Sequence, residues 1–197
     1  MDYWRETEYE YDKKGNVTLV TSYDENGDMT GEAEPKYDKK GNLIRITYYD
    51  ADENITAEYE FYKDGTRKSY VSYYENGKVS SEWENDEKGN TIYRADYKED
   101  GSLEREWEYE YKYDKNGNMT QEIAYNKGTL YAKYKYDSEG NETSGIYYDE
   151  DGKVAGEYEY KYKYDKYGNI TEETRYKDGE KTGKTKYEDW QVIYLAG

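Results

Sequence analysis

Charged and aromatic residues alternate along two long segments of the chain. Residues 106–114 read Glu-Trp-Glu-Tyr-Glu-Tyr-Lys-Tyr-Asp, and residues 157–165 read Glu-Tyr-Glu-Tyr-Lys-Tyr-Lys-Tyr-Asp. A ring at every second position has the period of a β-strand, because successive side chains of a strand point to opposite faces. The β-propensity of Tyr, Trp and Thr agrees with this assignment. The pattern therefore predicts strands with one aromatic face and one charged face.

Glycines interrupt these segments at intervals that are mostly twelve residues, and Glu53 stands where one glycine of the series is missing. Six of the glycines are followed by Asn. If Glu53 is counted, all six fall on odd steps of the series, and no glycine on an even step is followed by Asn. A chain that reverses at every turn puts odd and even turns at opposite edges of a sheet. The alternation therefore predicts an up-and-down meander of hairpin repeats. The six glycines are Gly15, Gly41, Gly89, Gly117, Gly140 and Gly168.

The predicted fold class is all-β, with about fifteen antiparallel strands. A sheet of that size is expected to be either one strongly coiled open sheet or a wide barrel. No linker divides the chain, so residues 1–197 are interpreted as a single β-repeat domain, with residues 190–197 as a terminal strand or cap. The steps that end at Gly117 and Gly168 are longer than the others and predict two long hairpins.

The turns have a consistent chemistry. Asp12-Lys-Lys-Gly15 places Asp at the first position of a turn and Gly at the fourth, and the same order recurs at the other Gly-Asn turns. An Asp side chain can accept hydrogen bonds from the free backbone N–H groups of a turn, and Gly adopts the positive φ that closes it. Gly117 and Gly168 are therefore predicted to have positive φ.

The composition is unusual for a folded chain. Leu, Ile, Val and Phe together make up 20 of the 197 residues, and the net charge is -17. These values alone favour disorder. The chain also has 31 tyrosines and 4 tryptophans, whose rings can stabilise a sheet face that is only partly buried. A folded protein with a thin aromatic core is expected.

The residues that are missing limit the possible chemistry. The chain has no Cys and no His, which leaves no thiolate or imidazole for catalysis or metal binding. No carboxylate pair or calcium loop with the required spacing is found, so we predict a protein that is not an enzyme, with no catalytic residues, no metal and no cofactor. The acidic balance argues against nucleic acid as a partner, and no apolar run indicates membrane insertion or a targeting signal.

The recurring unit Tyr-Asp-Lys-Xaa-Gly-Asn resembles the Rhs/YD-repeat family. It occurs at residues 11–16, 37–42, 113–118 and 164–169. The resemblance implies long curling β-sheets in bacterial surface or secreted proteins, and hence an extracellular or cell-surface location as a fragment of a larger protein. A weaker likeness, in Tyr73–Lys78 and Tyr147–Lys153, is to MORN-type repeats, which implies hairpin sheets used as scaffolds or bacterial antitoxins.

The aromatic residues of the two long hairpins are the candidate ligand-binding residues, because rows of rings flanked by polar groups can stack against sugars. The partner would be a carbohydrate or a protein surface. One alternative is an acidic immunity or antitoxin-like inhibitor that binds a basic protein through the intervening glutamates. A second is an engineered repeat protein, and the oligomeric state is left open. The candidate residues are Trp107, Tyr109, Tyr111, Tyr113, Tyr158, Tyr160, Tyr162 and Tyr164.

Overall fold

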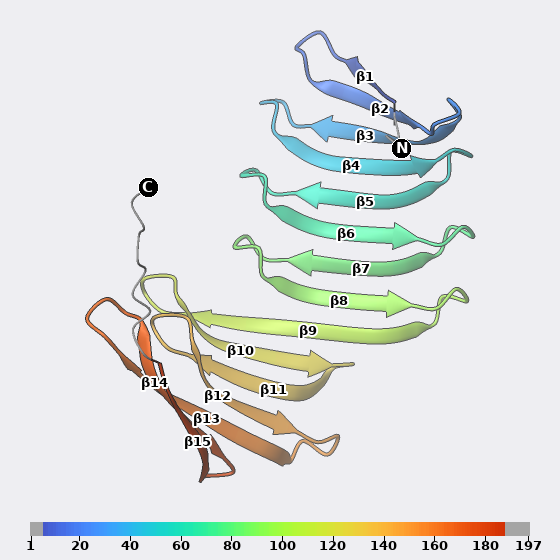
Figure 1. Cartoon of the computed structure of the whole chain (residues 1–197). Helices are drawn as coiled ribbons and strands as arrows, with labels where there is room; N and C mark the ends of the chain where they lie inside the picture. Colours follow the sequence, from blue (N-terminus) through green and yellow to red (C-terminus); the bar gives the residue numbers. More distant parts are fainter. Residues whose placement is uncertain (1–5, 188–197) are drawn as a thin grey trace. The chain divides into compact units, whose positions relative to one another are not determined.

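The computed structural model describes residues 6–187, which form fifteen strands that follow one another along one sheet, β1 to β15 (Figure 1). Neighbouring strands pair antiparallel, which confirms the predicted meander and its strand number. The strand order ends at β1 and β15, so the sheet is the open one of the two expected forms. Within residues 6–187 there is no helix long and apolar enough to span a bilayer.

The chain divides within β9 (Leu103–Tyr113) into two compact units, residues 1–108 and 109–197. The single domain stays a prediction, and residues 190–197, which were expected to form a terminal strand or cap, lie outside the described residues. The strands of the first unit are β1 (Thr7–Tyr11), β2 (Val17–Tyr23), β3 (Met29–Tyr37), β4 (Leu43–Asp50), β5 (Ile55–Phe61), β6 (Arg67–Tyr73), β7 (Val79–Asn85) and β8 (Thr91–Tyr97). Those of the second are β10 (Met119–Asn126), β11 (Thr129–Tyr136), β12 (Glu142–Tyr148), β13 (Val154–Tyr164), β14 (Ile170–Lys177) and β15 (Glu180–Lys186).

The two long steps of the repeat are taken up by strand length. β9 and β13 each have 11 residues, whereas the strands paired on either side of them have seven or eight.

An Asp carboxylate organises each Gly-Asn turn. In the first turn Gly15 has a φ of 87°. The Asp12 carboxylate accepts hydrogen bonds from the backbone N–H of Lys14 at 2.8 Å and of Asn16 at 2.9 Å, and from Nδ2 of Asn16 at 2.8 Å. The Asn16 side chain thus adds a hydrogen bond between the last and first residues of the turn, which explains why Asn follows Gly here. The same bond between Asp and Asn side chains lowers the pKa of Asp12. It recurs in the turns that contain Asn42, Asn90, Asn118, Asn141 and Asn169.

The turn at Glu53 keeps this geometry without a glycine. Glu53 has a φ of 63°, and its backbone N–H donates to the carbonyl of Asp50 at 3.2 Å. Asn54 donates its side-chain amide to Asp50, as in the Gly-Asn turns. Glu53 thus adopts the left-handed backbone conformation, which residues with a Cβ generally avoid. Gly117 and Gly168 have φ of 90° and 87°, as predicted.

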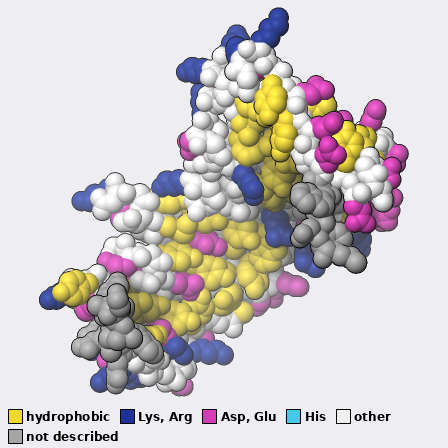
Figure 2. All heavy atoms as spheres, turned by 45° about the horizontal axis from the view of Figure 1, so that its top comes forward, with side chains coloured by type: hydrophobic (Ala, Val, Ile, Leu, Met, Phe, Trp, Pro, Cys, Tyr) yellow, Lys and Arg dark blue, Asp and Glu magenta, His cyan; other side chains and the backbone are white. Residues whose placement is uncertain are grey.

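The sheet has little enclosed core. Among the described residues the buried apolar side chains are Ala95, Ile123, Ala124 and Ala132, and no large side chain is completely buried. Stability must therefore come from rings that cover a sheet face while keeping their hydroxyls hydrated or hydrogen-bonded. Figure 2 shows hydrophobic side chains, tyrosines included, gathered into patches that remain visible from outside.

Tyrosine hydroxyls donate to glutamates fifteen residues earlier in the chain. Tyr23 donates to Glu8 at 3.0 Å, Tyr49 to Glu34 at 3.2 Å, Tyr73 to Glu58 at 2.9 Å, Tyr97 to Glu82 at 2.5 Å and, in the second unit, Tyr125 to Glu110 at 3.3 Å. Each pair links a tyrosine near the end of one strand to a glutamate within its hairpin partner. Burial and the bond to Glu58 raise the pKa of Tyr73 to about 12. We call these five hydrogen bonds the tyrosine ladder. It was not predicted from the sequence, although the constant spacing of fifteen residues from Glu to Tyr indicates it.

Candidate functional site

An aromatic row crosses β4 to β7 on one face of the first unit. Strand register places Ile46 opposite Tyr59, Tyr59 opposite Tyr70, and Tyr70 opposite Trp83. Because cross-strand neighbours lie within contact distance, period-2 alternation on four separate strands produces one continuous surface. We call this surface, with Tyr48, Phe61 and Arg67, the aromatic hollow.

The rings of the aromatic hollow pack against one another. The ring centroid of Tyr59 lies 4.7 Å from that of Tyr70, and Tyr70 stacks on Trp83 at 5.7 Å with 22° between the ring planes. Tyr48 meets Tyr59 edge-on at 5.9 Å. Such pairs contribute about 0.5–1.5 kcal/mol each beyond their burial. The row therefore stabilises the sheet, and burial raises the pKa of Tyr59.

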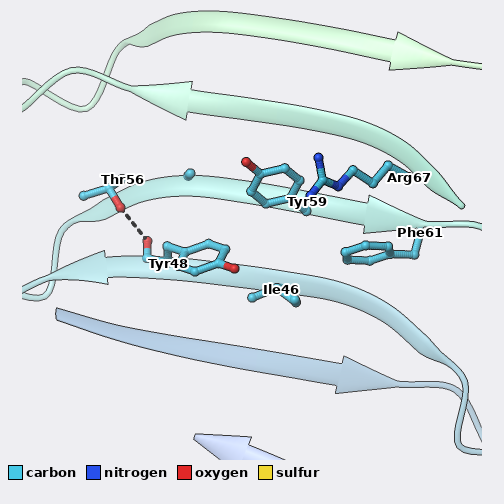
Figure 3. Close-up of a pocket in the computed structure, with 7 residues that line it drawn as sticks. Ile46, Tyr48, Thr56, Tyr59, Phe61 and Arg67 are labelled. Carbon is cyan, nitrogen blue, oxygen red and sulfur yellow. Dashed lines mark hydrogen bonds between the residues drawn. The ribbon is translucent and has the colours of Figure 1, made fainter. Parts of the chain in front are cut away.

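Part of the aromatic hollow, over β4 to β6, forms a shallow depression of about 500 Å³ (Figure 3). Tyr48 and Tyr59 form its aromatic side, with Ile46 and Phe61 beside them. Tyr48 is 37% exposed, so part of its side chain is accessible from solvent. The lining is mostly apolar and includes the hydroxyl-bearing Thr56, which donates to the Tyr48 carbonyl at 3.3 Å.

Arg67 forms the charged margin of the hollow. It is paired with Phe61 in the strand register, and its guanidinium carbon lies 5.4 Å from the centroid of the Tyr59 ring. Figure 3 shows the Arg67 side chain lying beside Tyr59. Cation–π attraction holds a guanidinium in this position while its N–H groups stay available to other acceptors.

The structure places the eight predicted ligand-binding residues in two separate strands. Trp107 lies opposite Arg94, and Tyr109 stacks on Tyr111 at 6.5 Å within β9. Three strands of the sheet lie between β9 and β13. The two sets therefore form two rows, and ligand binding by either stays a prediction.

The row in β13 is engaged in hydrogen bonds. Neighbouring rings from Tyr158 to Tyr164 have centroids 5.2 to 6.2 Å apart. The hydroxyl of Tyr158 donates to the Glu142 carboxylate, and that of Tyr162 donates to the Glu142 carbonyl at 2.9 Å. Tyr158 and Tyr160 also line a hollow of about 280 Å³ in the second unit. This hollow is smaller than the aromatic hollow of β4 to β7.

Sequence reasoning missed the aromatic hollow because it is built from single rings on different strands. Tyr59, Tyr70 and Trp83 do not belong to one alternating run, and the two long runs attracted the prediction instead. The available signal is the spacing of about twelve residues between them, which in a meander puts rings side by side.

Comparisons with known proteins do not identify a family for the chain. No protein-family model matches it, and no curated protein does. Solved structures that match include two TcdB2-TccC3 crystal structures, with TEV and with Cdc42, at 16% and 15% identity and TM-scores of 0.37 and 0.38. The match covers 91% and 89% of this chain, which spans 12% and 11% of those chains. A porin-like protein from Bacteroides uniformis matches at 11% identity and a TM-score of 0.37, over 92% of this chain and 89% of that one. At these values the likenesses carry no argument about this chain, and the similarity to Rhs/YD repeats stays a resemblance.

Proposed function

We propose that the chain is a non-catalytic β-repeat binding module of YD-repeat type, and that its aromatic hollow stacks against a sugar ring. The observation that carries the proposal is the exposed ring of Tyr48 in a concave, mostly apolar depression of about 500 Å³. This volume lies in the range of small-ligand sites, which combine an apolar lining with a few placed polar groups. A bacterial cell-surface or secreted location is part of the proposal.

The chemistry of a sugar suits this lining. One face of a pyranose ring presents C–H groups, which can pack on the electron-rich face of Tyr48, while its hydroxyls reach outward to water and to Thr56. Tyrosine suits such a contact because it has a large rigid ring with few rotatable bonds, so little side-chain entropy is lost on binding. Tyr48 packs against Tyr59 at 5.9 Å and is still 37% exposed, so its side chain is accessible to a ligand in the hollow.

Oligosaccharide titration tests the proposal. Binding is followed by calorimetry and by intrinsic fluorescence, with Trp83→Phe identifying the Trp83 contribution. Tyr48→Ala should weaken binding at least about fivefold, since one stacked ring contributes about 1 kcal/mol or more. The matched control is Tyr167→Ala, which removes a tyrosine that is 77% exposed in the second unit and should leave affinity unchanged. If no oligosaccharide produces heat or a fluorescence change at millimolar concentration, the proposal is wrong.

The opposite face of the same strands supports a second candidate, an acidic inhibitor that binds a basic protein. Four glutamates line a groove of about 210 Å³ there, namely Glu58, Glu60, Glu82 and Glu84. Glu58 and Glu60 already pair with Arg45, at 3.6 and 2.6 Å, so part of the negative charge of the groove is neutralised within the sheet. Association with a cationic protein should slow steeply with added salt and respond to Glu84→Gln. Tyr48→Ala should leave the association with the cationic protein unchanged.

A further inference from the structure

The charges of β5 to β7 are segregated between the two faces of the sheet. The glutamates of these strands face away from the aromatic hollow, because Glu58 pairs with Thr47 and Val71, and Glu60 pairs with Arg45 and Ser69. The cross-strand row through Tyr59 contains Ile46, Tyr70 and Trp83. Arg67 is the charged residue that lines the hollow. In a chain with a net charge of -17, the hollow thus has a local charge opposite to that of the whole.

Arg67 has no carboxylate partner in the described part of the chain. The ion pairs of residues 6–187 engage Arg45, Arg94 and Arg175 among the arginines. Lys68, the next residue after Arg67, points to Glu60 on the opposite face at 3.1 Å. The guanidinium of Arg67 instead lies over the Tyr59 ring. Its fork of N–H donors matches a carboxylate in a bidentate geometry.

We infer that the aromatic hollow selects acidic sugars, with a uronate residue packed on Tyr48 and its carboxylate held by Arg67, which line the same depression. The inference rests on the proposed sugar-binding function and adds the class of ligand. A pyranose bearing a carboxylate on its ring places an anion beside the stacked face, so both contacts can form together. The surrounding glutamates are on the other face of the sheet, which reduces the repulsion that an anionic ligand would otherwise meet.

A matched pair of ligands tests this selectivity. An oligogalacturonate and its carboxyl-reduced counterpart share linkage and length and differ only in the carboxylate. Wild type should bind the oligogalacturonate about tenfold more tightly, the factor expected for one charge-assisted hydrogen-bonded pair. Arg67→Gln should abolish this preference, so that the two oligomers bind with similar affinity. Arg67→Lys keeps the positive charge but lacks the paired N–H donors of a guanidinium, so it should retain part of the preference.

Arg94→Gln is the control for net charge. Arg94 lies opposite Trp83 in the register, but its guanidinium is paired with Asp96 at 3.6 Å, so its loss should not alter the preference. Equal binding of both oligomers by wild type, with no effect of Arg67→Gln, would overturn the inference and leave sugar binding intact. A preference that Arg94→Gln removes as fully as Arg67→Gln does would also overturn it. Binding of neither oligomer, nor of any other oligosaccharide, would overturn the inference together with the proposed function.

Discussion

Replacing Glu53 with glycine should stabilise the hairpin of β4 and β5. Glu53 has a φ of 63°, where the Cβ of an L-residue costs about 1–2 kcal/mol. Glycine removes this cost but loses about 0.5–1 kcal/mol through the larger freedom of the unfolded chain. The net gain is about 0.5–1 kcal/mol in the free energy of unfolding. For a protein of this size it corresponds to roughly 1–4 °C in melting temperature.

The Glu53 side chain gives no reason to expect a compensating loss. It is exposed, and the hydrogen bonds that define the turn involve its backbone and the side chains of Asp50 and Asn54. Glutamine at the same position separates the conformational effect from the removal of one negative charge. Gly65→Ala is the reciprocal control, because Gly65 has a φ of 88° and an added Cβ would meet nothing within 4 Å. It should destabilise by about 1 kcal/mol through the backbone alone.

Urea denaturation followed by circular dichroism measures these differences, and amide hydrogen exchange in β4 and β5 locates them in the hairpin. Exchange is needed because a repeat array can unfold in parts, and a single midpoint then averages over them. The reasoning is refuted if Glu53→Gln stabilises as much as Glu53→Gly, since the gain would then come from charge. A lower midpoint for Glu53→Gly would refute it as well.

Three further predictions follow from the turns, the tyrosine ladder and the composition. Gly117→Ala should lower the free energy of unfolding by about 1 kcal/mol or more because Gly117 has a φ of 90°, and an unchanged urea midpoint would contradict this. The pKa of Tyr73 is raised to about 12 from an ordinary value of 10. The protonated hydroxyl therefore stabilises the folded state fully below pH 10, and this stabilisation is lost as the pH rises through 12. Tyr73→Phe should therefore lose less stability than wild type between these pH values in urea titrations, and an equally steep loss would argue against the assignment. We also expect no hydrolytic activity, a prediction that a measurable rate abolished by one Asp or Glu substitution would overturn.

The sequence by itself determined the local elements of this protein. Alternation of rings and charges specifies strands because the side-chain period of a strand is two, and a Gly or a left-handed Glu53 at each step specifies where the chain reverses. These signals lie within a few residues of one another, and nearest-neighbour pairing follows from short turns. The order β1 to β15 and the conformations of Gly117 and Gly168 were predictable for this reason.

Only the tertiary structure decided which rings form the candidate site. The aromatic hollow depends on the register of β4 to β7, and the bulge before Phe61 sets Arg67 opposite it. A one-residue change of register would move these side chains to the other face. The surroundings of each tyrosine are also set in space: the hydroxyl of Tyr158 is bound to Glu142, whereas Tyr48 is 37% exposed. Which tyrosines hold the sheet together, and which are free to meet a ligand, is therefore set by neighbours that are distant in the chain.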